Sequence, residues 1–466
     1  MLLQIKDLSP IDLLILPLRK PPSLSGRYNV IRKITIHHQR DILMNICKQF
    51  KCITCETIID CRIGMSNRDI QPFQFACPEC EEQITFVFGS DNDELSGAVD
   101  ILNFKGPFQG ENHFIDLHID FPVAFDKYEM GDTAFFRALH TIGEESFSHL
   151  NLRLDTLNKL YSKKTELRRL ITQYKRNDIQ SYEKVINSID FPSIKLKSHK
   201  KEDVLAALYS ATSIMSSPFT IHEHNREISD NAPKIIHMLH DEHHENTVKF
   251  IKKITTSNFL NNLHYDCIGL YPKMLGFDLP VRPALFYDYV EMDDISKSPA
   301  RVSSADFDAC NNFYKDLAEV FSRLLTLVAG IDNLLNRGDS DLFDDSMKLN
   351  KKNKLIKEFA SLDNFSDLDL GRKIEAINES FYHVDANSID NKLRNGIAHY
   401  KYEYKESTQL IKYYPRKEGM NRETYHEIYF LEFMRKTLLL FREIHSLNHI
   451  VKALLYYCVL VLKIDI

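Results

Sequence analysis

Three residues whose types can do chemistry lie close together near the C-terminus, in the segment NKLRNGIAHYKYEY (391–404). His399 can exchange a proton near neutral pH, and Arg394 can hold an anion with its planar fork of donors. Asn395 follows the arginine directly and adds an amide that can donate and accept. These residues are therefore a candidate active site, and the alternative is that they only decorate the outside of a helix.

The local pattern predicts that this segment is a helix anchored on a core. Ile389, Leu393 and Ile397 are spaced four apart, which places them on one helical face. On an ideal helix Asn395 and His399 share a face, whereas Arg394 points about 140° away from His399. We therefore expect Arg394 to reach round, or the helix to bend at Gly396.

Spacing alone does not identify a site, because other arginines and histidines in the chain stand in similar relation. Arg32 and His37 have the same spacing inside an expected strand. Arg442, His445 and His449 line one side of an expected C-terminal helix and form a rival constellation. The context of the 394–399 segment is what favours it.

The segment LRNGIAHY, between two long amphipathic helices, resembles the R-x(4–6)-H motif of the HEPN superfamily, including the polar residue that usually follows the arginine. The resemblance covers about residues 303–466 and implies a helical-bundle domain. Most similar families are ribonucleases of toxin–antitoxin, abortive-infection and CRISPR-linked systems that cut RNA as dimers without a metal. Some members have lost the motif and only bind.

The resemblance implies roles that suit the side chains. His399 would be the general acid or base, and Arg394 would hold the scissile phosphate. Asn395 would orient His399 or the scissile group. One motif supplies one histidine, so two motifs across a twofold axis would supply both an acid and a base, which favours a homodimer. Similar families often add a polar or acidic residue from an earlier helix, for which Asp332, or Asn333, is the candidate. Tyr413 and Tyr414, among basic residues, are candidates for stacking on bases.

A second set of residues has the spacing of a metal site. Cys52 and Cys55 form one CxxC pair, Cys77 and Cys80 form another, and 21 residues separate the pairs. Two such turns complete a tetrahedron of thiolates, the arrangement of a zinc ribbon. Because four thiolates leave no open position for water, we expect a structural Zn²⁺ and no metal or other cofactor in catalysis.

Histidines gather in HMLHDEHHE (237–245), where His237, His240 and His244 fall on one side of a helix. No second ligand segment accompanies them except His222 and His224. Polar helix faces collect histidines without binding a metal, so we favour that interpretation.

Composition is that of a globular protein: of 466 residues, 44% are apolar and 27% charged, and the net charge is −6. The acidity excludes a strong nucleic-acid field over the whole surface and leaves local basic patches. The N-terminal residues lack the pattern of a secretory signal, and the longest apolar run (453–462) is too short to cross a bilayer. We therefore expect a cytoplasmic protein that does not associate with membranes.

The chain predicts an α+β fold that is mostly α. We expect a β-rich region at 1–130 containing the ribbon at about 48–90, a helical middle at 131–300, and a HEPN-like helical domain at 301–466. The expected helices of the last region cover about 313–336, ending at Gly338, and about 429–446. Residues 408–417 between them are a β-insertion or a loop.

Three functions remain open from the sequence. The leading hypothesis is a metal-independent endoribonuclease, by resemblance an abortive-infection, antiviral effector toxic to its own cell and triggered by a phage-derived or host protein. The alternative is a zinc-ribbon and helical-bundle protein that binds or scaffolds a partner without catalysis. A third is DNA-directed regulation through the ribbon, which predicts strongly salt-dependent binding to duplex DNA.

Overall fold

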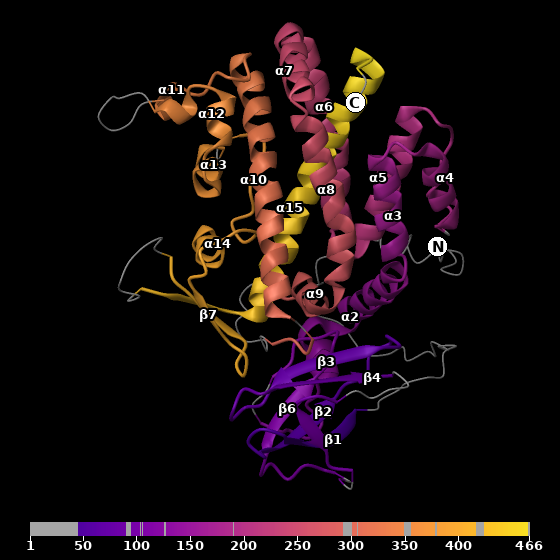
Figure 1. Ribbon diagram of the computed structural model, residues 1–466, viewed down its shortest axis with the longest axis vertical. Helices are drawn as coiled ribbons and strands as arrows, with labels where there is room; N and C mark the ends of the chain where they lie inside the picture. The colour runs from indigo at the N-terminus through magenta and orange to yellow at the C-terminus, as the bar shows by residue number, and fades with distance from the viewer. Residues whose placement is uncertain are drawn as a thin grey trace, which may run out of the picture. The chain divides into compact units, whose positions relative to one another are not determined.

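The structure is a computed structural model that describes residues 45–89 and 95–464, except 103, 105, 125–126, 190, 292–300, 305, 349–355, 378–379 and 416–423. Strands come first and helices make up most of the rest of the chain, so the predicted α+β, mostly α class is confirmed (Figure 1). The chain divides into two compact units, residues 1–156 with 286–304, and residues 157–285 with 305–466. The basic stretch at 27–40, including Arg32 and His37, lies outside the described residues.

The first unit contains a four-stranded sheet and a hairpin. The sheet has the order β5-β1-β2-β6, in which β2 pairs antiparallel with β1 and parallel with β6. Its strands are β1 (Ile46–Cys52), β2 (Ile58–Ile63), β5 (Ala98–Asp100) and β6 (His113–Leu117); β3 (Gln71–Ala76) and β4 (Gln83–Phe88) form the hairpin. Phe50 packs against Phe75 and Phe86, which joins the sheet and the hairpin in one apolar core.

A buried ion pair connects the neighbouring strands β2 and β6 to the helix that comes next. Arg62 in β2 and Asp116 in β6 form two parallel hydrogen bonds of 3.0 Å each, and Arg137 adds a contact of 2.6 Å to the same carboxylate. Arg137 lies in α2 (Ala134–Tyr161), which is interrupted at Gly143 by a non-helical backbone with φ of 76°. Paired and hydrogen-bonded, these buried charges fix where α2 begins.

The second unit is built of helices around α10 and α15. Its longer helices are α3 (Lys164–Lys175), α4 (Ile179–Ser188), α5 (Lys201–Ser216), α6 (His222–Glu242), α7 (His244–Thr256), α8 (Phe259–Gly276), α9 (Asp278–Leu285), α10 (Phe307–Arg337) and α15 (Phe430–Tyr456). The helix α15 packs against α10, α9, α6 and α8, and lies at the centre of this bundle (Figure 1).

The two helices predicted for the C-terminal region are present. The helix α10 ends where expected, because Gly338 adopts a left-handed backbone with φ of 72° and its N–H caps the Leu334 carbonyl. The helix α15 continues ten residues beyond the predicted end at 446 and passes into a π-helical turn, η6 (Tyr457–Leu462). Within the described residues, one helical stretch, Phe430–Leu462, is long and apolar enough to cross a membrane, but 67% of its most apolar window is buried in the protein. Core helices share this composition, so this stretch is only a weak indication of a membrane span.

A small sheet comes directly after the candidate motif. It contains β7 (Tyr402–Lys405), β8 (Leu410–Tyr413) and β9 (His426–Tyr429) in antiparallel order. The uncertain stretch at 408–417 is therefore a β-insertion, at least through Tyr413. The strand β8 packs against α14 (Asn391–Ala398), the helix that carries the candidate motif.

Candidate functional site

The motif lies on a short, well-anchored helix. The Asp390 side chain caps the start of α14 by accepting from the backbone N–H groups of Lys392 (2.8 Å) and Leu393 (3.1 Å). Leu393 and Ile397 are fully buried. The predicted apolar anchor is therefore confirmed, and it presents Arg394, Asn395 and His399 toward the outside.

The helix does not bend at Gly396 but ends just after it. His399 is the C-cap, Tyr400 adopts a left-handed backbone with φ of 54°, and Lys401 N–H donates to the Gly396 carbonyl at 2.7 Å. This is the hydrogen-bond pattern of a Schellman motif with tyrosine in place of the usual glycine. A Cβ on Gly396 would lie 3.2 Å from the Cβ of Tyr413, so close packing on β8 explains the glycine.

Arg394 does not point freely into solvent, because an acidic residue holds it. Its guanidinium donates to Glu319 Oε1 on α10 across 2.6 Å and to Asn395 Oδ1 at 3.4 Å. The Arg394 side chain is 22% exposed and that of Glu319 is 55% exposed. Sequence reasoning missed Glu319, since its contact with Arg394 joins residues 75 apart in the chain.

An aromatic residue and a lysine extend the same surface. Tyr400, directly after His399, is 75% exposed, and the ammonium of Lys315 on α10 lies 5.2 Å from the centre of its ring. His399 and Asn395 are also exposed. The surface formed by the partly exposed Lys315 and Arg394 and the exposed Asn395, His399 and Tyr400, called the motif surface below, combines donors, an imidazole and a stacking face.

The acidic partner nominated from sequence lies elsewhere in the same chain. Asp332 is 13 residues beyond Glu319 on α10, or about 20 Å along the helix axis. Its carboxylate binds Arg337 at 3.1 Å, and the neighbouring Asn333 is buried and donates to the Ser340 carbonyl at 2.9 Å. Within one chain, Asp332 and Asn333 are therefore not part of the motif surface.

Two further candidates from the sequence are buried. Tyr413 and Tyr414 are 4% and 7% exposed, and their hydroxyls donate to Asp390 and Glu403, so the expectation that they stack on bases is wrong. The rival constellation on α15 also lies inside the bundle, since Arg442 donates to the Phe219 carbonyl at 2.7 Å. Burial lowers the pKa of His445 to about 3 and that of His449 to about 4.

A buried lysine lies behind the motif surface and was not found from sequence. Lys373, on α13 (Leu370–Ala376), is 2% exposed and donates to the Ser322 carbonyl and hydroxyl on α10, both at 3.2 Å. Burial lowers the pKa of Lys373 to about 8, although the carboxylate of Glu319 opposes this shift. Glu319 thus stands between two cationic side chains, Arg394 and Lys373.

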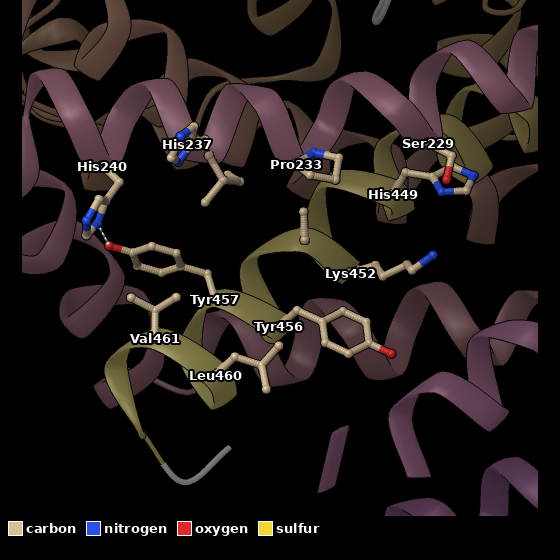
Figure 2. A pocket seen from close by; sticks show the side chains of 12 residues that line it. Ser229, Pro233, His237, His240, His449, Lys452, Tyr456, Tyr457, Leu460 and Val461 are labelled. Carbon is tan, nitrogen blue, oxygen red and sulfur yellow. Dashed lines mark hydrogen bonds between the residues drawn. The ribbon is translucent and has the colours of Figure 1, made fainter. Parts of the chain in front are cut away.

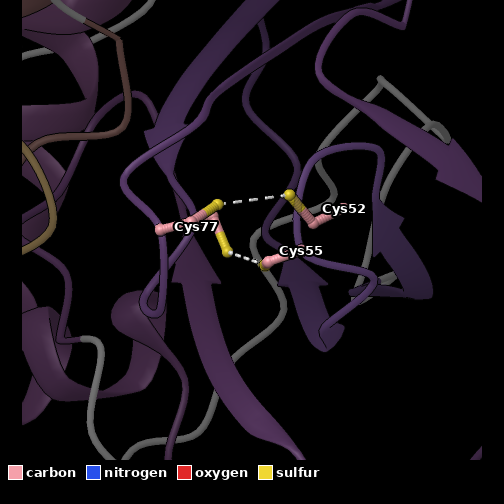
Figure 3. A group of neighbouring side chains, drawn as sticks. Cys52, Cys55 and Cys77 are labelled. Atoms are coloured by element: carbon pink, nitrogen blue, oxygen red, sulfur yellow. Dashed lines mark hydrogen bonds between the residues drawn. The ribbon is translucent and has the colours of Figure 1, made fainter.

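The four cysteines of the predicted ribbon come together at one point (Figure 3). All four Sγ atoms lie within 4.8 Å of one another, and the Cys52–Cys80 and Cys55–Cys77 pairs are each 3.6 Å apart. A tetrahedral ion with metal–sulfur bonds of about 2.3 Å requires sulfur atoms about 3.8 Å apart, so the cluster fits a metal ion. Among the described residues no other group of three such ligands comes together.

Two turns of the same shape build this cluster. Each CxxC is followed by a glutamate in left-handed conformation, Glu56 with φ of 63° and Glu81 with φ of 61°. In each, that glutamate's N–H donates to the carbonyl of the first cysteine, at 3.1 Å for Cys52 and 3.0 Å for Cys77. Hydrogen bonds from Thr57 lower the pKa of Cys55 to about 6, whereas burial raises the pKa of Cys77 to about 12.

Comparisons of this chain with protein-family models, with curated proteins and with solved structures find no match. A proposal for the function therefore rests on the fold, the motif surface and the cysteine cluster.

Proposed function

We propose that the protein is a metal-independent endoribonuclease of HEPN type and that the motif surface is where it cuts RNA. The observation that carries the proposal is that the exposed Asn395 and His399 and the partly exposed Arg394 lie together at the end of one anchored helix, beside an exposed tyrosine. A phosphate ligand, a proton carrier and a stacking face are the three elements that cleavage of single-stranded RNA needs.

The residues would divide the reaction between them. A base removes the proton from the RNA 2′-hydroxyl, the oxygen attacks the adjacent phosphorus, and the bond from phosphorus to the 5′-oxygen breaks as an acid protonates that oxygen. His399 carries one of these protons, Arg394 neutralises the charge that develops on the phosphate oxygens, and Asn395 positions Arg394. The products are a 2′,3′-cyclic phosphate end and a 5′-hydroxyl end.

A homodimer would complete this chemistry. One motif surface contains one imidazole, while the reaction needs both an acid and a base. Two copies related by a twofold axis would bring two His399 side chains to one phosphate. The defence role, with a phage-derived or host protein trigger, rests on the resemblance and is proposed with the same chemistry.

The cysteine cluster has a separate part in this proposal. We assign it Zn²⁺, because four thiolates favour zinc among common ions and fill all its positions. An ion held in this way would tie the β1–β2 turn to the β3–β4 turn and would do no chemistry.

The test is cleavage of total RNA by purified protein in excess EDTA, compared among wild type, His399→Ala, Arg394→Ala and the control His426→Ala. His426 lies in β9, outside the motif surface. Fragments with 2′,3′-cyclic phosphate ends from wild type and His426→Ala alone would support the proposal. The proposal would be contradicted if His399→Ala and Arg394→Ala cut RNA as fast as wild type, or were as toxic on expression as wild type.

A specific contact favours a second function, the non-catalytic binding module. The ion pair with Glu319 already compensates the charge of Arg394, which favours a structural role for this arginine on a protein-binding surface. In that case wild type would cut no RNA in the presence or absence of its trigger, and His399→Ala would bind the same partner with the same affinity. Co-expression with phage, followed by RNA end mapping, separates the two functions.

A further inference from the structure

A pocket of about 520 Å³ lies in the second unit between α6 and the C-terminal part of α15 with η6 (Figure 2). Its volume is within the range of small-molecule sites. The apolar part of its lining is formed by Pro233, Ile236, Ala453, Leu460 and Val461. Leu460 and Val461 are 47% and 52% exposed, so this part of the lining offers apolar surface that a bound ligand could cover.

The lining carries cationic and neutral groups but no carboxylate. Besides the apolar residues, it consists of Ser229, His237, His240, His449, Lys452, Tyr456 and Tyr457. One end is closed by a hydrogen bond of 2.6 Å between Tyr457 and His240, while His449 and Lys452 lie toward the other end (Figure 2). At one end of the pocket the polar groups of Tyr457 and His240 are hydrogen-bonded to each other, and at the other end lies the ammonium of Lys452.

Lys452 at the cationic end lacks an anionic partner. Burial is the cause that lowers its pKa, and no nearby carboxylate among the described residues opposes this shift. Its ammonium lies 5.7 Å from the centre of the Tyr209 ring, which offers only weak compensation. A half-buried ammonium without a counter-charge is unfavourable, and an anion bound beside it would offset that cost.

His449 supplies an independent sign of a missing partner at the same end. Its Nε2 atom is buried and, within the described part of the chain, has no hydrogen-bond partner. Buried polar atoms of side chains almost always have one. Because Nε2 has almost no accessible surface, the His449 ring would have to rotate for a head group beside Lys452 to reach this atom.

We propose that this pocket binds a small amphipathic anion, whose apolar body lies along Pro233, Ile236 and Leu460 and whose carboxylate or phosphate head contacts Lys452. The site belongs to α6 and α15 and does not include the motif surface. The proposal does not depend on RNA cleavage.

The experiment is isothermal titration of the full-length protein with three probes that share a ten-carbon chain, each below its micelle concentration. Decanoate and decyl phosphate carry anionic heads, and decyltrimethylammonium carries a cationic one. We expect one anion to bind at one site per chain at least about tenfold more tightly than the cation. Whichever of the two anions binds more tightly shows whether the site prefers a carboxylate or a phosphate head group.

Three variants locate the binding. Lys452→Met keeps most of the length of the side chain and should weaken the binding of the anion about tenfold or more. Ala453→Phe should fill the pocket and abolish binding. Lys249→Met, at an exposed lysine on α7, is the matched control and should bind as wild type does. Circular dichroism checks that each variant is folded. No binding of either anion at 1 mM, equal binding by Lys452→Met, or a cation that binds as tightly would overturn the proposal.

Discussion

The Arg394 guanidinium donates to the Glu319 carboxylate across 2.6 Å, and this contact joins the candidate cleavage motif on α14 to the long helix α10. An arginine held by a carboxylate has less positive charge to offer a phosphate. If Arg394 acts on RNA, the phosphate must therefore compete with Glu319 for the same donors. The ion pair is partly exposed, so we expect that competition to be possible at a modest energetic cost.

Replacement of Glu319 by glutamine should raise the rate of RNA cleavage. An ion pair of this exposure contributes about 0.2–1 kcal/mol, so we expect kcat/KM to increase by a factor of about 1.4 to 5. Asp316→Asn, on the same helix and paired with Lys273 at 2.6 Å, is the matched control and should leave the rate unchanged. A lower rate in Glu319→Gln would mean that the carboxylate positions Arg394 productively or takes part in the reaction.

Tyr400 should contribute to RNA binding by stacking. It is 75% exposed beside His399, with the Lys315 ammonium over its ring. Loss of one base–aromatic stack costs about 1–3 kcal/mol, so Tyr400→Ala should raise the Kd for a single-stranded RNA about 5- to 150-fold. The measurement uses the His399→Ala background, in which the RNA stays intact.

The control for this prediction keeps the ring. Tyr400→Phe should bind RNA within about twofold of the parent, because stacking needs the aromatic face and not the hydroxyl. Equal Kd values for Tyr400→Ala and Tyr400→Phe would place the RNA elsewhere.

Local patterns predicted the parts of the site that depend on neighbouring residues. The spacing of Leu393 and Ile397 predicted the anchored helix, Gly338 predicted the end of α10, and the paired CxxC turns predicted the cysteine cluster. In each case the chemistry involves residues within one turn or one repeated motif.

The sequence patterns did not predict the contacts between segments that are far apart in the chain. Glu319 and Lys373 resemble ordinary surface charges in the sequence, and only the packing of α13 and α14 on α10 brings Glu319 to Arg394 and Lys373 to Ser322. Tyr413 and Tyr414 alternate with basic residues as a stacking surface would, yet packing against α14 and hydrogen bonds to Asp390 and Glu403 bury both. Periodicity shows that a face is apolar or polar, but not what covers it.

The cysteine cluster should contain about one zinc ion per chain in protein purified without chelator. Elemental analysis by mass spectrometry measures this directly. Cys77→Ser removes one thiolate, so it should lose the zinc and lower the melting temperature of the first unit by more than about 10 °C. Cys47→Ser changes an exposed cysteine of β1 outside the cluster and should keep both zinc and stability. A zinc-free wild type, or a Cys77→Ser variant with unchanged stability, would exclude a structural ion.

Glu443 should make the stability of the second unit depend on pH. Its carboxylate on α15 accepts a hydrogen bond from the Tyr382 hydroxyl, and burial raises the pKa of Glu443 to about 7. An unfolded glutamate titrates near pH 4.3, so the folded state holds an extra proton between these values. Its contribution to stability is complete below about pH 4 and is lost as the pH rises through about 7.

Glu443→Gln, which stays neutral at every pH, should therefore gain stability over wild type as the pH rises from 5 to 8. The pKa of about 7 corresponds to a difference of about 3 kcal/mol between the two ends of that range. Urea unfolding at a series of pH values measures it, with Glu427→Gln, an exposed carboxylate in β9, as the control that should follow wild type. If the free energy of unfolding of Glu443→Gln parallels wild type from pH 5 to 8, Glu443 is ionised in the folded protein and the Tyr382 hydrogen bond, not protonation, accommodates its charge.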